Sequence, residues 1–326
     1  MGWQELPLAQ TLPGEAASAM LGDCIGYPAR RMQRKVVVFG GGGQLGIELC
    51  REFERRSWKV TKLERQTLDV TNSALVEDAV ARAEAELVVN AAAYNQVDIA
   101  EREPLAAFQA NALAVRNIAM ACRQAGAKLV HYSTDYVFDG TKGSSYVESD
   151  ATHPLGAYAV SKLAGELYAQ AYLDSALIVR TSGVFGPAGM FTPRGNFVEV
   201  MLRMAKNGQP IRVVMDHVAS PTYAPAIAMR TAEMVEKKLA GIYHLGGGEP
   251  VSWYEYARLI FETAGLTPSL QPTDEREYRT EARRPKYSAL SNAKLNAAGI
   301  EPMPPFRDAV KAYLEARAFA TAHRSA

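Results

Sequence analysis

Short apolar runs recur at regular intervals over the first half of the chain. Val36–Phe39 is apolar throughout, which is typical of a parallel strand buried on both faces of a sheet. Further strands of this kind are predicted at Lys59–Leu63, Glu86–Asn90, Lys128–Tyr132 and Ala176–Arg180.

Between these strands, apolar residues recur at helical spacing. Gly126 follows one of these stretches directly and is a stop signal for a helix. Strands that alternate with helices in this way predict an α/β fold, a Rossmann-like doubly wound parallel sheet. The predicted helices run from the glycines after Phe39 through Phe53, and over Leu75–Ala83, Leu105–Ala125 and Tyr158–Tyr172.

The alternation weakens after residue 182. We therefore expect an NAD(P)-binding Rossmann domain over 35–182 and a smaller C-terminal substrate-binding lobe over 183–326, with some elements returning to the main sheet. Short strands are predicted at Ile211–Val214 and Ile242–His244. Helices are predicted near 196–207, 224–238, 252–264 and 306–318.

Residues 1–34 contain several prolines and glycines and show no sustained period. Met32 stands directly before the first strand, where a natural start is expected. We expect 1–34 to be an N-terminal extension without a catalytic role, and an arm that packs on a partner subunit is the alternative.

Composition excludes several classes of protein. The chain is 48% hydrophobic and 22% charged with a formal net charge of +1, so no nucleic-acid-binding surface is expected. Cys24, Cys50 and Cys122 lack the spacing of a disulfide framework or a metal site, which is typical of a reducing compartment. No apolar run reaches the roughly 20 residues that span a bilayer, and no secretory signal precedes the first strand. No membrane association and a cytoplasmic protein are therefore expected.

The first predicted strand leads into a glycine-rich turn with the spacing Gly40-x-x-Gly43-x-x-Gly46. Such a turn lets the backbone approach a pyrophosphate closely and lets the following helix pack on the sheet. The amide groups at the start of that helix, around Gln44 and Leu45, favour an anion. The turn therefore predicts a dinucleotide cofactor, NADPH or NADH.

The ends of the next two strands extend this cofactor site. Glu64 and Arg65 follow the second strand, and they favour NADH and NADPH respectively, so both cofactors stay open. Asp69 and Val70 are expected in the adenine-binding loop. Small side chains at the end of the third strand leave room for the dinucleotide, namely Ala91, Ala92 and Ala93.

A tyrosine and a lysine four residues apart are the candidate catalytic pair. Tyr158 and Lys162 lie on one face of a predicted helix. An ammonium group near a phenol lowers the phenol pKa from about 10 and eases proton transfer. Thr134 ends the fourth strand, where an open α/β sheet places its chemistry, and its hydroxyl can donate to a substrate carbonyl. Tyr132, in the same segment, is expected beside the cofactor.

Together these features resemble the extended short-chain dehydrogenases/reductases, and over residues 35–320 the dTDP-4-dehydrorhamnose reductase family in particular. That family reduces the C4 keto group of dTDP-4-dehydro-L-rhamnose. The resemblance implies that Tyr158 is the proton donor, Thr134 its partner on the substrate oxygen, and Lys162 the cofactor anchor. It is carried by Asn90–Tyr94, Val97-Asp98 with Ala100-Glu101, Ser133–Gly140, Tyr158–Glu166 and Arg283-Arg284-Pro285.

The resemblance also implies a nucleotide-sugar substrate. Asp135, Asn196 and Arg284 are implied as substrate-binding residues, and Arg284 is alternatively a link between two loops. Related dehydratases carry Asp-Glu where this chain has Asp135-Tyr136, so a simple reductase is favoured over an elimination.

The chain departs from the family at Gly183, where members commonly have a tryptophan that contacts the sugar. The exact hexose therefore stays open, and so does a reductase of another nucleotide-linked 4-ketosugar. A non-catalytic NADP-binding subunit, as in methionine adenosyltransferase, is the second alternative. Some members use magnesium at a subunit interface, but only Glu48 suggests a ligand here. The oligomeric state stays open, with a homodimer as one candidate.

Overall fold

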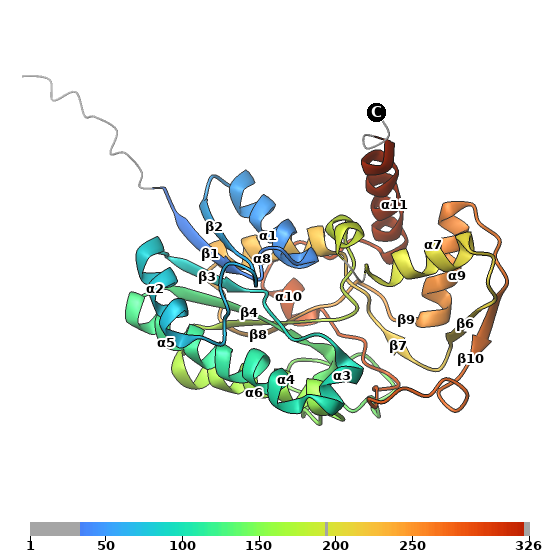
Figure 1. Ribbon diagram of the computed structural model, residues 1–326, viewed down its shortest axis with the longest axis horizontal. Helices are drawn as coiled ribbons and strands as arrows, with labels where there is room; N and C mark the ends of the chain where they lie inside the picture. The colour runs from blue at the N-terminus through green and yellow to red at the C-terminus, as the bar shows by residue number, and fades with distance from the viewer. Residues whose placement is uncertain (1–32, 193–194, 323–326) are drawn as a thin grey trace, which may run out of the picture. The chain divides into compact units, whose positions relative to one another are not determined.

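A six-stranded parallel sheet lies at the centre of the computed structural model, which describes residues 33–192 and 195–322 (Figure 1). The predicted N-terminal extension lies outside the described residues as far as Met32. The strand order is β2-β1-β3-β4-β5-β8, so β2 lies on one side of β1 and the later strands follow one another on its other side. The predicted doubly wound sheet is therefore confirmed. The strands are β1 (Lys35–Phe39), β2 (Lys59–Leu63), β3 (Leu87–Asn90), β4 (Lys128–Thr134), β5 (Leu177–Thr181) and β8 (Gly241–Leu245).

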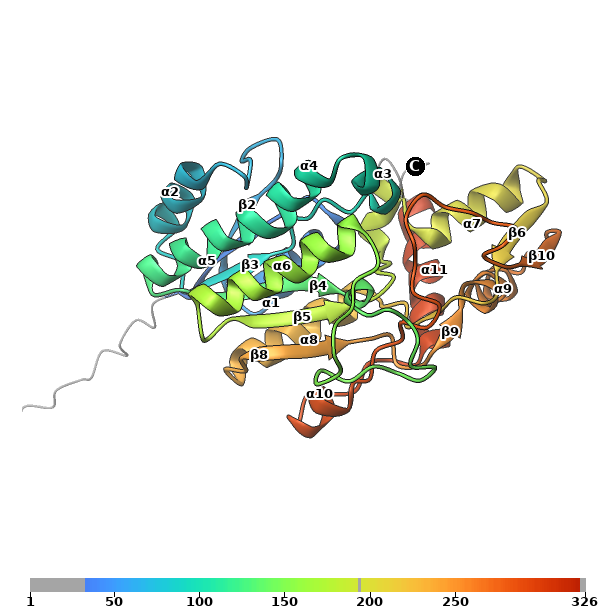
Figure 2. The same ribbon diagram turned by 90° about the horizontal axis from the view of Figure 1, so that it is seen from below.

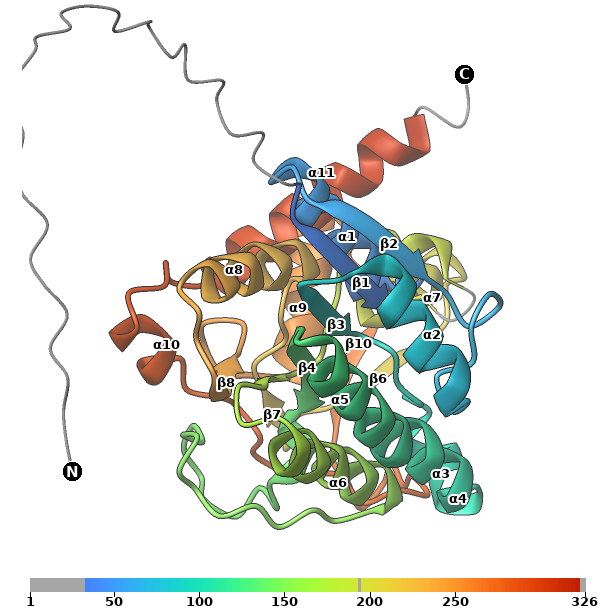
Figure 3. The same ribbon diagram turned by 90° about the vertical axis from the view of Figure 1, so that its left-hand side faces the viewer.

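Helices cover both faces of this sheet, as parallel strands with apolar residues on both faces require (Figures 2 and 3). On one face lie α1 (Gln44–Arg55) and α8 (Ala224–Glu236). On the other lie α2 (Ser73–Ala83), α5 (Ala114–Ala125) and α6 (Ala157–Tyr172).

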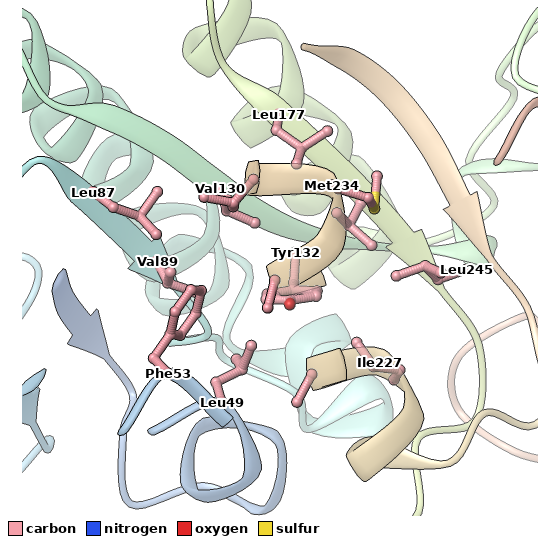
Figure 4. Close-up of a cluster of buried hydrophobic side chains, with 14 of the residues drawn as sticks. Leu49, Phe53, Leu87, Val89, Val130, Tyr132, Leu177, Ile227, Met234 and Leu245 are labelled. Atoms are coloured by element: carbon pink, nitrogen blue, oxygen red, sulfur yellow. The ribbon is translucent and has the colours of Figure 1, made fainter. Parts of the chain in front are cut away.

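The core beneath α1 and α8 shows how these layers meet (Figure 4). Leu49 and Phe53 of α1 are fully buried against the strands, and so is Ile227 of α8. Burial of a side chain of this size stabilises the fold by roughly 1.5–3 kcal/mol. The apolar face of each helix therefore fixes the helix on the sheet.

The long helix predicted over Leu105–Ala125 is interrupted. It consists of α4 (Pro104–Phe108), a π-helical turn (Gln109–Leu113) and α5. Gly126 ends it in a left-handed conformation with φ +68°, as the stop signal predicted. A short helix that the sequence did not predict, α3 (Val97–Arg102), precedes α4.

The second half builds a separate apolar cluster around Phe185 and Tyr256. The strands β6 (Ile211–Val214) and β10 (Leu270–Thr273) pair in parallel, and β7 (Val218–Ala219) and β9 (Val251–Ser252) pair antiparallel, whereas β8 joins the main sheet beside β5. The functional division at residue 182 stays a prediction. The elements are α7 (Phe197–Lys206), β6 (Ile211–Val214), β7 (Val218–Ala219), β9 (Val251–Ser252), α9 (Trp253–Ala264), β10 (Leu270–Thr273), α10 (Ala293–Ala297) and α11 (Phe306–Ala322).

None of the described helices has both the length and the apolar character that a membrane crossing requires.

A buried ion pair fixes α6 to the sheet. Glu166 of α6 and Arg180 of β5 are 1% and 2% exposed. The guanidinium donates through Nε and Nη2 to the two carboxylate oxygens, at 2.9 and 2.7 Å. Removing one partner of such a pair leaves the other charge buried without compensation.

We expect Glu166→Gln to lower the free energy of unfolding by about 3–5 kcal/mol, because Arg180 then stays buried without a counter-charge. Urea denaturation followed by circular dichroism measures this loss. The control is Asp78→Asn, which breaks the exposed Asp78–Arg82 pair on α2 and should cost less than about 1 kcal/mol. Equal effects of the two substitutions would contradict an anchoring role for Glu166.

Candidate active site

The candidate catalytic residues meet at the carboxyl edge of the sheet. Thr134 is the last residue of β4, and it pairs in register with Thr181 at the end of β5. Tyr158 and Lys162 lie on the first two turns of α6, which packs against β4. The fold thus brings together residues that are 24 to 28 positions apart in sequence.

The side chains of Tyr158 and Thr134 lie near enough for the Thr134 hydroxyl to act on the Tyr158 pKa. Burial raises the pKa of Tyr158 to about 12, the nearby Thr134 hydroxyl opposes this shift, and the charge of Asp135 adds to it. The sequence-based expectation was a pKa lowered by Lys162, but in the protein alone burial sets the direction of the shift and Lys162 is not among its causes. A phenol with a raised pKa is protonated at neutral pH, which is the state that a proton donor needs.

Lys162 is buried, one helical turn after Tyr158 on α6. Its side chain is 3% exposed, and Nζ donates to the carbonyl oxygen of Tyr132 at 2.5 Å. Burial lowers the Lys162 pKa to about 8, and the negative charge of Glu166 partly offsets this. The phenol of Tyr132 itself lies in the core, where its hydroxyl pairs with Thr231 at 2.6 Å. Tyr132 therefore offers its backbone carbonyl to the site, whereas its side chain is structural.

Asp135 is the buried carboxylate of the site. It is 3% exposed and accepts hydrogen bonds from Ser182 Oγ at 2.8 Å, Ser288 Oγ at 2.5 Å and Thr134 Oγ1 at 3.2 Å. Burial raises its pKa to about 6 against the effect of these hydroxyls. Because these hydroxyls occupy its oxygens, the predicted substrate contact of Asp135 stays a prediction, and its observed role is to orient Thr134.

Ser182 and Ser288 are site residues that sequence reasoning did not single out. Ser182 directly follows β5, and a hydroxyl at the carboxyl end of a predicted strand was the available signal. Ser288 comes from a loop late in the second half, and nothing in its sequence neighbourhood marks it.

The glycine turn has the geometry of a phosphate cradle. Gly40 has φ +73°, and a Cβ there would lie 2.5 Å from the amide nitrogen of Ala92. A Cβ on Gly46 would collide with the Gly40 carbonyl oxygen. Gly43 is the N-cap of α1 and provides no side-chain cap, so the first amide groups of α1 can hold an anion. These residues fit a dinucleotide pyrophosphate.

The residues predicted at the next strand ends surround this turn. Glu64 lies against Gly42 and forms an ion pair with Lys62 at 2.6 Å, while Arg65 is exposed beside it. Asp69 is exposed and accepts hydrogen bonds from Thr71. Partly buried side chains next to them are Val70, Ala91 and Ala92, and Ala93 is exposed.

Other predicted ligand residues have structural partners. Gln44 donates to the Val184 carbonyl at 2.9 Å, and Leu45 packs on the core. Asn196 caps α7 by accepting from the Glu199 amide, and it is 8% exposed. Cofactor or substrate contacts of these side chains stay predictions.

Arg284 is also occupied. Its guanidinium pairs with both carboxylate oxygens of Asp98 at 3.0 and 2.7 Å, which links a loop of the second half to α3. This contact favours the loop-linking alternative of the sequence analysis over a diphosphate contact.

Glu48 pairs with Arg51 at 3.1 Å, and burial raises its pKa. It belongs to no group of three ligand residues in the described chain. The one such group among 33–192 and 195–322 is Asp216, His217 and Glu275. There Lys286 already lies 3.5 Å from Asp216 and 3.1 Å from Glu275, so an ammonium provides the positive charge.

Gly183, where the family commonly has tryptophan, adopts φ +48°. A Cβ at this position would lie 3.3 Å from Pro221 and from the ring of Trp253. The backbone here is thus strained for any residue other than glycine.

Comparisons with known proteins agree with this geometry. A family model described as RmlD substrate binding domain matches residues 34–319. The spore coat polysaccharide biosynthesis protein SpsK of Bacillus subtilis (strain 168) is 36% identical over 286 residues, which are 88% of this chain and 99% of that protein. The dTDP-4-dehydrorhamnose reductase of Escherichia coli (strain K12) is 37% identical over 295 residues, covering 86% of this chain and 96% of the relative.

Among solved structures, dTDP-4-dehydrorhamnose reductase from Bacillus anthracis str. Ames in complex with NADP superposes with a TM-score of 0.83 at 33% identity. The match covers 87% of this chain and 99% of that chain. UDP-glucose 4-epimerase from Thermus thermophilus, complexed with NAD, has a TM-score of 0.76 at 26% identity, and the match covers 88% of this chain and 99% of that chain. On the family model, the relatives and the shared fold, this chain belongs to the dTDP-4-dehydrorhamnose reductase family.

Proposed function

We propose that this protein reduces the C4 keto group of dTDP-4-dehydro-L-rhamnose to give dTDP-L-rhamnose, using NADPH or NADH. The observation that carries the proposal is that Thr134 at the end of β4 and Tyr158 and the buried Lys162 on α6 come together at the carboxyl edge of the sheet. The names of the relatives and the NADP and NAD of the neighbouring structures support it.

Each residue of the site has a separate role in the proposed ketone reduction. A nicotinamide cofactor, when bound, would supply the hydride for the ketone carbon, so the residues of the site must deal with the negative charge on the ketone oxygen. Tyr158 gives its phenolic proton to that oxygen, and the Thr134 hydroxyl holds the same oxygen in place. Lys162 would hold the ribose of the cofactor, and the first amides of α1 would hold its pyrophosphate.

Tyr136 supports reduction rather than elimination. A dehydratase of the same fold needs a carboxylate base at this position, and the Tyr136 phenol, whose pKa burial raises, cannot serve as one at neutral pH. The exact hexose is the least constrained part of the proposal because of Gly183. A reductase of another nucleotide-linked 4-ketosugar is the second candidate.

We further place the protein in the cytoplasm. Cys50 and Cys122 are free and buried, and burial raises their pKa values to about 11 and 12, so neither thiol is poised to form a disulfide. Magnesium binding and a homodimer stay predictions.

Tyr158→Phe should lower kcat for the ketosugar by about 100- to 10,000-fold, because it removes the proton donor and keeps the ring. NADPH affinity should change little, since Lys162 and the glycine turn are intact. Single-turnover hydride transfer at saturating NADPH, followed at the nicotinamide absorbance, measures the effect. Equal rates in wild type and variant would exclude Tyr158 as the acid. No turnover by wild type on any nucleotide ketosugar would favour the regulatory-subunit alternative.

The affinity of the free enzyme for NADPH should fall as pH rises through about 8. The Lys162 pKa is depressed by burial, so the ammonium that holds the ribose is present below this value and is lost above it. The same decrease near this pH should appear in kcat/KM for NADPH of the wild type. It should also appear in the NADPH affinity of Tyr158→Phe, measured as a dissociation constant. A profile that is flat well above this pH would contradict the assignment to Lys162.

Gly43→Val should abolish NADPH binding without loss of the fold. Gly43 has an extended conformation that valine adopts, and a Cβ there would meet only the Gly40 carbonyl oxygen, at 3.3 Å. Its side chain would then occupy the space of the pyrophosphate. Gly46→Ala is the contrast, because its Cβ collides with the backbone of Gly40 and should lower the melting temperature. Fluorescence titration with NADPH and thermal unfolding separate the two outcomes, and unchanged NADPH affinity of Gly43→Val would show that the cradle is wrongly placed.

A further inference from the structure

The short helix α3 has no part in the function proposed above, yet two of its carboxylates face the surroundings of Tyr158. Its sequence, Val97–Arg102, lies between the cofactor side of β3 and the helix α4. Both carboxylates bind groups that are far away in the sequence.

The first carboxylate caps the helix that carries Tyr158. The N-cap of α6 is Gly156, which has no side chain to satisfy the amides of the first turn. Glu101 Oε1 accepts the Ala157 amide at 2.8 Å instead. A Cβ on Gly156 would lie 2.5 Å from this oxygen, so glycine makes room for it. A carboxylate at a helix N-terminus is also favoured by the helix dipole. Glu101 therefore fixes the residue that directly precedes Tyr158.

The second carboxylate reaches Tyr158 through two further side chains. Asp98 holds the Arg284 guanidinium with both oxygens, and it also accepts the Ala282 amide at 3.1 Å. Its hydrogen bond with Arg284 lowers the Asp98 pKa, so the pair is ionised at neutral pH. Arg284 in turn acts electrostatically on Tyr136: the phenol raises the Arg284 pKa, and the guanidinium opposes the upward shift of the Tyr136 pKa.

Tyr136 completes this path. Its ring stands edge-on to the ring of Tyr158, with centroids 6.1 Å apart and an interplanar angle of 87°. In this geometry the positive edge of one ring faces the negative face of the other. The position of the Tyr136 ring is thus set at one end by Arg284 and at the other by Tyr158.

We propose that α3 is the positioning element for Tyr158, with Glu101 fixing the first turn of α6 and Asp98 fixing the phenol ring through Arg284 and Tyr136. These are positioning residues, since none of them is placed at the reacting atoms. The inference rests on the proposed function for Tyr158. In this proposal Arg284 positions the ring of Tyr136 and does not bind the diphosphate of the substrate.

Asp98→Ala and Arg284→Ala should each lower kcat by about 10- to 100-fold, because a displacement of about 1 Å at a catalytic group costs this much. KM for the ketosugar nucleotide and the NADPH dissociation constant should change by less than about threefold. Since both residues act in one path, the double variant should be no slower than about twice the worse single variant. Glu101→Ala should lower kcat similarly, and Glu101→Gln, which keeps an acceptor oxygen, should restore most of it.

The matched control is Glu281→Gln. It breaks the exposed pair between Glu281 and Arg102, which also joins α3 to the loop of Arg284, at 3.0 Å. Its kcat should be that of wild type. A raised KM of Arg284→Ala at unchanged kcat would show that the guanidinium contacts the substrate. Additive losses of kcat in the double variant would show that Asp98 and Arg284 act independently. Either result overturns the proposal.

A second measurement does not depend on turnover. With 3-fluorotyrosine incorporated, the fluorine resonance of Tyr158 is identified by its loss in Tyr158→Phe. Asp98→Ala should shift or broaden this resonance in the folded protein, and Glu281→Gln should leave it unchanged. An unchanged resonance in Asp98→Ala overturns the positioning role, whereas a shifted resonance in a protein without ketoreductase activity would count against the proposed function alone.

Discussion

The site depends on one buried pair of charges. Glu166 and Arg180 have left water for the interior, and this is tolerable only because each satisfies the other through two hydrogen bonds. The pair determines where α6 lies on β5. Glu166 is one helical turn after Lys162 on the same helix, so its negative charge also favours the ammonium form of that lysine. A single carboxylate thus both anchors α6 and favours the ammonium form of Lys162.

Around this anchor, hydroxyl groups from distant parts of the chain meet at Asp135. Thr134 comes from β4, Ser182 from the end of β5 and Ser288 from the second half. A carboxylate surrounded by donors draws these segments together, and its charge is satisfied without a cation. The second half is therefore attached to the sheet edge at the very place where the reaction is proposed, and the orientation of Thr134 depends on that attachment.

The sequence predicts those parts of the structure that rest on local periodicity. The run Val36–Phe39 and the glycine turn after it identify the first strand and the cofactor cradle, and Gly126 marks a helix end correctly. The helix α3 was missed because six residues are too few to show a period, and the strands β7 and β9 are shorter still. Tyr132 was expected at the cofactor, but alternation along β4 turns its ring into the core. Ser288 joins the site only through tertiary contacts, which no local pattern records.

The π-helical turn at Gln109–Leu113 restricts how many residues this segment can contain. A π-turn holds one residue more than the regular helix around it. Asn111, at its centre, is fully buried and binds both the Tyr94 backbone and Ser161 Oγ, on the turn between Tyr158 and Lys162. Deleting one residue here would let the segment become a continuous α-helix and rotate this asparagine away, while α4 and α5 kept their own hydrogen bonds. Insertions and deletions at this position are thus constrained by the active site, although the helix itself would accept them.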